Sequence, residues 1–283
     1  MSLRNHKVAV FFKRIDNRIA TEVRPIRVTL DAYGYAQASV LYEQGNTKVL
    51  CGVTLQPGVP PFLKGQRVGW LSAEYTMLPT ATHQRTQRDG SQSQRNARSV
   101  EISRLIGRCL RPVVDLAAIG ERTIIIDCDV LQADGSTRVA CITAASIALQ
   151  IAAKRWAQRK IFDKNVVTMQ VAAVSVGVID GHICADLSYE EDVRGDADFN
   201  IILTEHGDIL EIQGTAENTP LSWDNFGIVR TTAQAAIKTI LLAIVQQMPQ
   251  DIAMTNPQLK TAHPWASKEE KQPIFSLANR FTK

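Results

Sequence analysis

The sequence lacks most of the patterns that mark metalloproteins, secreted proteins and membrane proteins. Its five cysteines lie far apart in apolar runs and form no CxxC pair, which argues against a zinc site or a disulfide framework and favours buried thiols in a reducing compartment. Neither an apolar run of about 18 residues nor a secretory signal is found, so we expect no membrane partner and a cytoplasmic location. No HExxH or Ser/His/Asp pattern is present, and the five histidines are scattered.

Lysine is missing from the most basic part of the chain. Residues 80–111 hold seven arginines and no lysine, against Asp89 and Glu101, which leaves a net charge of +5 in a chain whose total is +4. Arginine is favoured where a planar fork of donors recognises phosphate oxygens. Charge alone leaves a second interpretation open, in which a solvated arginine face on a helix adjoins a loose basic loop.

Hydrophobic periodicity predicts the fold class. With 283 residues, of which 45% are hydrophobic, the chain can bury a full core. Alternating apolar residues predict strands, and longer amphipathic or apolar segments predict helices. The main elements expected are a hairpin around Gly45, helices over about 98–110, 137–159 and 222–247, and late strands over 167–178, 183–189 and 200–203. Helices between strands, with hairpins among them, predict an α+β fold with a mixed β-sheet packed against helices.

Two segments are suited to binding an anion. Gly135-Ser136-Thr137 leads from an apolar strand into an apolar helix, so it offers unpaired backbone N–H groups, two hydroxyls and the positive end of a helix dipole. Arg138 adds a guanidinium group in the first turn of that helix, and Arg98 opens the preceding helix. These groups predict a phosphate site.

The segment from Glu190 to Asp198 is acidic. Carboxylates crowded together repel each other unless a cation or a base shares them, and a pair can hold Mg²⁺ that keeps waters and phosphate oxygens as its other ligands. A solvated acidic loop is the alternative. Arginines for an RNA backbone, a site for a small anion and paired carboxylates for a metal together predict attack of inorganic phosphate on a phosphodiester.

Six blocks in this sequence resemble, in order, the signatures of the ribonuclease PH family. They are RIDNR at 14–18, FLKGQ at 62–66, LSAEY with MLP at 71–79, LQADG with TR at 131–138, VAAVSVG at 171–177 and EIQGTAE at 211–217. The resemblance covers about residues 14–248. It implies a single ribonuclease PH-type catalytic domain there, with an N-terminal extension at 1–13 and a C-terminal tail at 249–283.

This resemblance implies a phosphorolytic 3′→5′ exoribonuclease, or tRNA nucleotidyltransferase, which trims tRNA 3′ ends and releases nucleoside diphosphates. Inorganic phosphate would be the co-substrate, Mg²⁺ or another divalent cation the cofactor, and a homohexamer, built as a trimer of dimers, the assembly. The implied roles are phosphate binding by Arg98, Ser136, Thr137 and Arg138, catalysis and metal binding by Asp192 and Asp198, and guidance of RNA by Arg85 and Arg88.

The chain departs from the family pattern at three places. Ser136 replaces a usual glycine, and its side chain is expected to narrow the phosphate turn. Thr80 stands where an arginine is frequent, and residues 193–195 place Arg194 near the carboxylates. Two other functions remain open: a non-catalytic or partner-dependent RNA-binding subunit of an exosome-like ring, and a metal-dependent phosphotransferase acting on small molecules.

Overall fold

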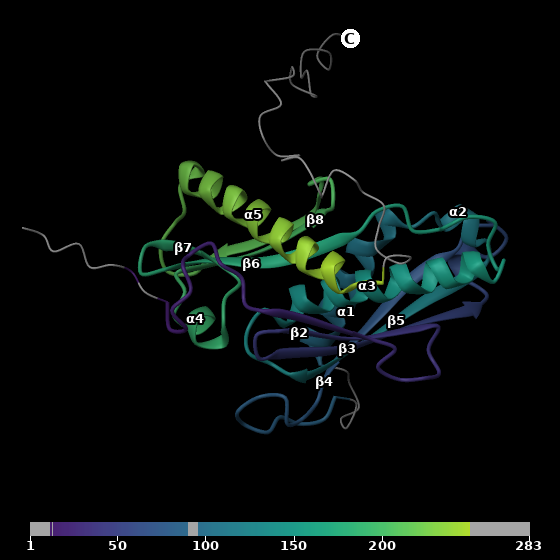
Figure 1. Cartoon of the computed structure of the whole chain (residues 1–283), viewed down its shortest axis with the longest axis horizontal. Helices are drawn as coiled ribbons and strands as arrows, with labels where there is room; N and C mark the ends of the chain where they lie inside the picture. The colour runs from purple at the N-terminus through teal and green to yellow at the C-terminus, as the bar shows by residue number, and fades with distance from the viewer. Residues whose placement is uncertain (1–11, 13, 90–95, 250–283) are drawn as a thin grey trace, which may run out of the picture.

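The structure is a computed structural model that describes residue 12, residues 14–89 and residues 96–249 (Figure 1). Most of the N-terminal extension, residues 90–95 of the arginine-rich loop, including Arg95, and nearly all of the C-terminal tail lie outside the described residues. The strands are β1 (Ile26–Leu30), β2 (Ala38–Gln44), β3 (Thr47–Pro57), β4 (Trp70–Met77), β5 (Arg122–Gln132), β6 (Val171–Ile179), β7 (His182–Ala185), β8 (Ala197–Thr204) and β9 (Ile209–Ala216). The helices are α1 (Ala97–Leu110), α2 (Leu116–Ile119), α3 (Thr137–Gln158), α4 (Tyr189–Val193) and α5 (Trp223–Gln247).

The first sheet is mixed, as the sequence predicted. Its five strands have the order β1-β2-β3-β5-β4, and the β4–β5 pair is parallel whereas the other pairs are antiparallel. The predicted hairpin joins β2 to β3, with Gln44 opposite Thr47 and Gly45 in the left-handed conformation that its tight turn needs.

A second, antiparallel sheet has the order β7-β6-β8-β9, and the sequence did not separate it from the first. The strand predicted over 183–189 is wrong beyond Ala185, because the chain turns and Tyr189 begins α4. Ser188 and Glu191 form a capping box there, which satisfies backbone donors at the start of this short helix. The acidic segment therefore begins as a helix and continues into β8, and is not a loop throughout.

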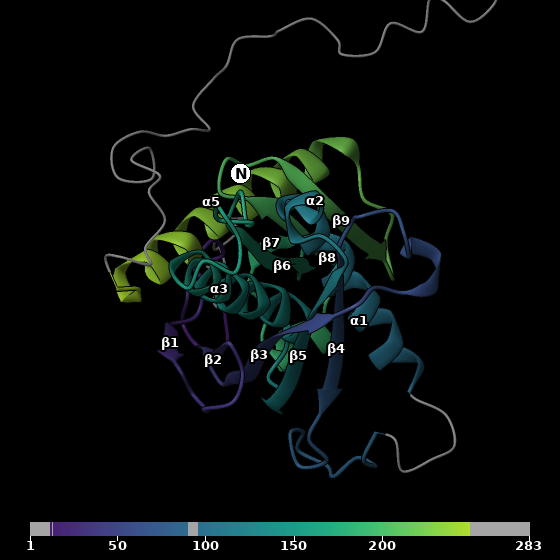
Figure 2. The ribbon, with the colours of Figure 1, turned by 90° about the vertical axis from the view of Figure 1, so that its right-hand side faces the viewer.

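Helix α3 lies between the two sheets (Figures 1 and 2). It is buried almost all round because it packs against β2 and β3 on one side and β6 on the other. Helix α1 packs along β4, and α5 covers the other face of the second sheet. The first turns of α1 and α3, the loop after β4, and α4 come together around one pocket, so this layering positions the site.

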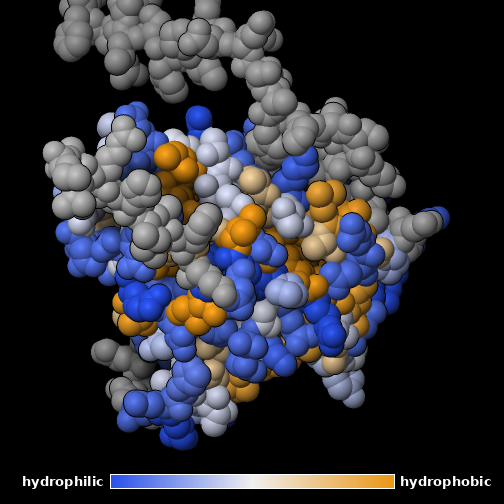
Figure 3. All heavy atoms as spheres, turned by 60° about the vertical axis from the view of Figure 1, so that its left-hand side comes forward, coloured by the Kyte–Doolittle hydropathy of each residue, from blue (hydrophilic) through white to orange (hydrophobic). Residues whose placement is uncertain are grey.

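Within the described chain, α5 is the one helix that length and composition would allow to cross a membrane. Its buried positions, which include Ile237 and Ile240, pack against strands of both sheets, so its apolar character is that of a core helix. The face of the molecule in Figure 3 is mostly hydrophilic, with apolar side chains scattered among polar ones.

Candidate active site

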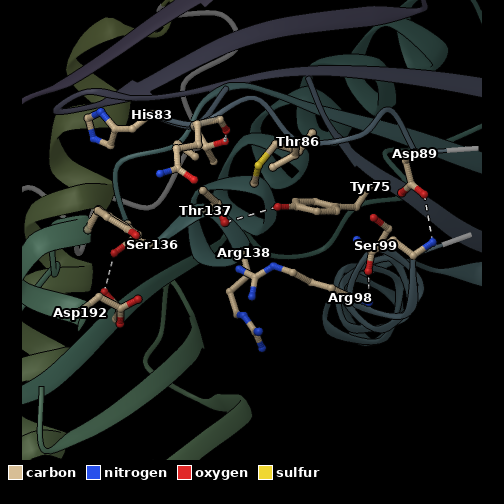
Figure 4. A pocket seen from close by; sticks show the side chains of 18 of the residues that line it. Tyr75, His83, Thr86, Asp89, Arg98, Ser99, Ser136, Thr137, Arg138 and Asp192 are labelled. Carbon is tan, nitrogen blue, oxygen red and sulfur yellow. Dashed lines mark hydrogen bonds between the residues drawn. The ribbon is translucent and has the colours of Figure 1, made fainter. Parts of the chain in front are cut away.

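A pocket of about 800 Å³ lies where the two sheets, α1, α3 and α4 meet. It brings six of the eight predicted site residues together, namely Arg98, Ser136, Thr137, Arg138, Asp192 and Asp198. Figure 4 shows Arg98 and Arg138 near the middle of this pocket, with Ser136 and Asp192 on one side and Ser99 and Asp89 on the other. Segments that are far apart in sequence thus place cationic and anionic side chains around a common space.

The turn that leads into α3 needs its glycine. Gly135 has a φ of +71°, and a Cβ atom there would lie 2.5 Å from the carbonyl oxygen of Leu187. The next residue, Ser136, also has a positive φ, +57°, which a non-glycine residue adopts only at some cost. The turn therefore packs its backbone directly against the segment that precedes α4.

The hydroxyl of Ser136 is held by the protein. Ser136 Oγ lies 2.8 Å from the carbonyl oxygen of Leu187 and 2.6 Å from Ser175 Oγ, and Ser175 Oγ accepts the N–H of Leu187 at 3.1 Å. A carbonyl only accepts, so Ser136 donates its one hydroxyl proton to Leu187 and Ser175 donates to Ser136. In this structure the hydroxyl proton of Ser136 is therefore engaged within the protein, and a contact between this hydroxyl and an anion stays a prediction. Its backbone N–H remains the group that Ser136 could present to phosphate.

Both predicted phosphate-binding arginines lie in the first turn of a helix. Asn96 caps α1 by accepting the N–H of Arg98 at 3.0 Å, while Arg138 Nη1 lies 3.2 Å from Gln213 Oε1 and 3.3 Å from Glu101 Oε1. In the part of the chain that the structure describes, the N–H groups of Thr137 and Arg138 donate to no other group. The first turn of α3 therefore has N–H donors without a partner among the described residues, and Arg138 in this turn lines the pocket.

Tyr75 also lines the pocket, next to Thr137. Its hydroxyl lies 3.4 Å from Thr137 Oγ1, and burial raises the pKa of Tyr75 to about 12, although Thr137 and Arg98 act in the opposite direction. The phenol is therefore protonated at neutral pH. It is a residue that the sequence analysis did not single out as part of the site.

The two aspartates come from different elements. Asp192 lies on the last turn of α4 and Asp198 on β8. Burial and the charge of Asp192 raise the pKa of Asp198 to about 6, while Arg138 opposes this shift. Desolvation of its carboxyl group also raises the pKa of Asp192, although the residue is exposed; Arg98 and Arg138 act against this increase. These couplings show that the arginines and the carboxylates influence one another electrostatically.

The carboxylate of Asp198 is incompletely satisfied. Its Oδ2 accepts from Asn200 Nδ2 at 3.2 Å, but its buried Oδ1 has no hydrogen-bond partner among the described residues. Two carboxylates share the pocket, and no group of three or more His, Cys, Asp or Glu side chains suited to a metal occurs in the described ranges. This donor set fits a cation such as Mg²⁺, which takes few protein ligands and keeps positions for water and phosphate oxygens.

Buried ion pairs anchor α4 and the segment that precedes it, and the sequence did not predict them. Arg14 Nε and Nη2 donate to the two carboxylate oxygens of Glu191 at 2.7 and 2.6 Å, and Arg24 donates to both oxygens of Asp186. Burial opposes ionisation of Glu191, but the hydrogen bond and charge of Arg14 outweigh it and keep the pKa of Glu191 below its ordinary value. The RIDNR block was recognised only as part of a family signature, and nothing in the sequence identified Glu191 as its partner.

The predicted RNA guides, Arg85 and Arg88, are not brought into the pocket. Both are exposed on the loop that follows β4, while their neighbours Gln84, Thr86 and Gln87 line the cavity. Their role in RNA guidance stays a prediction. The structure adds a loop residue that the sequence did not single out, His83, which also lines the pocket.

Comparisons with known proteins agree with this architecture. Residues 22–154 match the model of domain 1 of the 3′ exoribonuclease family, and residues 170–226 match domain 2. The chain belongs to this family, which is the ribonuclease PH-type family that its sequence blocks resemble.

Solved structures with the same fold include exosome subunits. Rrp46 of rice (Oryza sativa) is 18% identical with a TM-score of 0.66, and the match covers 83% of this chain and 100% of that chain. A chain of the Archaeoglobus fulgidus exosome, solved with RNA bound to the active site, is 20% identical with a TM-score of 0.69, and the match covers 82% and 92%. A chain of an archaeal exosome core is 21% identical with a TM-score of 0.66, covering 81% and 89%. At these identities the likeness concerns the fold.

Proposed function

We propose that this protein is a phosphorolytic 3′→5′ exoribonuclease that trims the 3′ ends of tRNA precursors, with inorganic phosphate as the nucleophile. The observation that carries the proposal is that Arg98, Arg138 and the first turn of α3 line the same pocket as Asp192 and Asp198. Membership of the 3′ exoribonuclease family supports the reaction class. Choice of tRNA as the substrate rests on the resemblance of the sequence blocks to ribonuclease PH.

In the proposed reaction, phosphate lies between the two arginines and attacks the phosphorus of the 3′-terminal linkage of RNA. A bond forms between a phosphate oxygen and this phosphorus, and the bond from phosphorus to the 3′ oxygen of the preceding nucleotide breaks. That 3′ oxygen takes the proton which the attacking hydrogen phosphate gives up. The products are a nucleoside diphosphate and an RNA that is one nucleotide shorter and ends in a 3′ hydroxyl.

The residues of the chain orient the nucleophile. Arg98 and Arg138 offer forked donors to phosphate oxygens, and the free N–H groups at the start of α3 add donors at the positive end of the helix dipole. Gln213 and Glu101 hold Arg138 Nη1, so this guanidinium is directed before phosphate binds. Such preorganised charge lowers the barrier because it needs no rearrangement during the reaction.

Asp192 and Asp198 would hold the divalent cation. Mg²⁺ bound there supplies positive charge that offsets the charge developing on the phosphodiester. The unpartnered Oδ1 of Asp198 and its raised pKa support this assignment, because a cation relieves both the missing contact and the repulsion from Asp192.

A second candidate function is a partner-dependent subunit of an exosome-like ring, because the similar structures include exosome subunits. The presence of both arginines and both aspartates around one pocket favours catalysis by this chain itself. We propose assembly as a homohexameric ring in the cytoplasm, and light scattering of the purified protein would measure the mass of the assembly.

Incubation of the purified protein with a 3′-extended tRNA and Mg²⁺, with and without phosphate, tests the proposal. We expect nucleoside diphosphates only when phosphate is present. Nucleoside monophosphates would indicate hydrolysis, and no turnover by the protein alone would favour the partner-dependent subunit.

A further inference from the structure

Two aromatic rings meet at the wall of the pocket without being part of the core. The ring centroids of His83 and Tyr189 lie 6.0 Å apart with an interplanar angle of 50°. His83 comes from the loop after β4 and Tyr189 from the start of α4, and both line the pocket. Tyr189 is 49% exposed, which is unusual for a large aromatic side chain and leaves much of its ring accessible.

Tyr189 is close to the carboxylates. It precedes Asp192 by three residues on α4, and side chains at this spacing lie on the same face of a helix. The ring is therefore displaced by only about one helical turn from the predicted metal-binding carboxylate. A nucleotide whose phosphate lies at Asp192 would have its base within reach of this ring.

The position of Tyr189 is fixed by the backbone. Its N–H donates to Asp134 Oδ1 at 3.2 Å, and Asp134 Oδ2 also lies 3.7 Å from Arg24 Nη1. The buried ion pair between Arg14 and Glu191 also anchors α4 to the N-terminal part of the chain. These contacts fix the helix that carries the Tyr189 ring next to the turn at Gly135 and Ser136. A fixed position suits a residue that positions a substrate.

We propose that Tyr189 is a stacking platform for the base of one of the two nucleotides that flank the scissile linkage, and that His83 supports it. This inference rests on the proposed function. At 6.0 Å the two rings are in the range of direct contact, so a base does not fit between them. His83 instead packs near one side of the Tyr189 ring, and the base stacks on the accessible side. Stacking on an aromatic face tolerates any base, as an exonuclease that removes each kind of nucleotide requires.

The test compares Tyr189→Ala and Tyr189→Phe on RNA substrates that carry a normal base or an abasic site at the last or the penultimate nucleotide. Tyr189→Ala should raise the KM for RNA about tenfold, because the loss of a stacking side chain weakens RNA binding. The kcat at saturating RNA should be nearly unchanged. Tyr189→Phe keeps the ring and should keep the parent KM. The matched control is Tyr35→Ala, since Tyr35 is fully exposed and lies outside this pocket.

The decisive readout is the coupling between residue and base. At one of the two positions, the abasic substrate should raise the KM of the parent protein about tenfold, and Tyr189→Ala should add little on that substrate. Equal effects of Tyr189→Ala on normal and abasic RNA at both positions would overturn the stacking assignment. Thermal unfolding of each variant checks the fold. If the parent itself shows no phosphate-dependent turnover, the proposed function fails, whereas turnover without this coupling rejects the platform alone.

Discussion

Replacing Asp198 by asparagine should abolish turnover and yet stabilise the metal-free protein. Burial of the carboxyl group and the negative charge of Asp192 raise the pKa of Asp198 from 3.8 to about 6. At 1.36 kcal/mol per pKa unit, the folded protein loses about 3 kcal/mol at neutral pH by keeping this group ionised. Solvent at the pocket mouth screens part of this cost, so we expect Asp198→Asn to stabilise by about 1 to 2 kcal/mol.

The pH dependence follows from the direction of the shift. Because the folded-state pKa of Asp198 is raised, the penalty is complete above pH 6 and disappears below the unfolded value of 3.8. Thermal unfolding in the presence of a chelator should therefore show a melting temperature for Asp198→Asn that is a few degrees above that of the parent at pH 7.5. The difference should shrink as the pH falls towards 4.

Activity and binding assays complete this prediction. Asp198→Asn should still bind RNA, because Arg98 and Arg138 are unchanged, but it should release no nucleoside diphosphate. Turnover near the parent rate would reject the metal assignment. A variant less stable than the parent at pH 7.5 without metal would show that the carboxylate is not strained as the structure indicates.

Three further substitutions probe other parts of the site. Arg138→Ala should raise the KM for phosphate about tenfold or more, since it removes charge-assisted hydrogen bonds, while Arg104→Ala, outside this pocket, should not. Glu191→Gln should lower the free energy of unfolding by about 3 kcal/mol or more in denaturant titration, because the Arg14 guanidinium would remain buried without its carboxylate partner. The control variant Glu190→Gln, at an exposed neighbouring residue, should have a free energy of unfolding within about 0.5 kcal/mol of the parent. Ser136→Ala should be less stable than Ser136→Gly by about 1 kcal/mol, because only glycine relieves the positive φ, and equal stabilities would refute that reasoning.

The elements that position the site were largely predictable from local pattern. Helix α3 was expected over about 137–159 and spans Thr137–Gln158, because its apolar run and its small-residue entry are both local signals. The start of α1 at Ala97 likewise follows from the arginine-rich amphipathic segment. These two helix starts carry the residues that are predicted to bind phosphate.

What could not be predicted depends on contacts between distant residues. The end of β7 at Ala185 and the helical start at Tyr189 follow from a capping box and from the pairing of Glu191 with Arg14, which is 177 residues away. The ring of hydrogen bonds that occupies the hydroxyl of Ser136 involves Ser175 and Leu187, on other elements. Periodicity contains no information about such pairings. For the same reason, the contact between the His83 and Tyr189 rings could not be predicted from the sequence.

The central claim is that inorganic phosphate, held in this pocket, becomes part of the released nucleotide. Isotopically labelled phosphate incubated with the protein, Mg²⁺ and a 3′-extended tRNA tests it most directly. We expect the label in the β-phosphate of nucleoside diphosphates, and we expect Arg138→Ala to reduce this incorporation at low phosphate. Release of unlabelled monophosphates would contradict it.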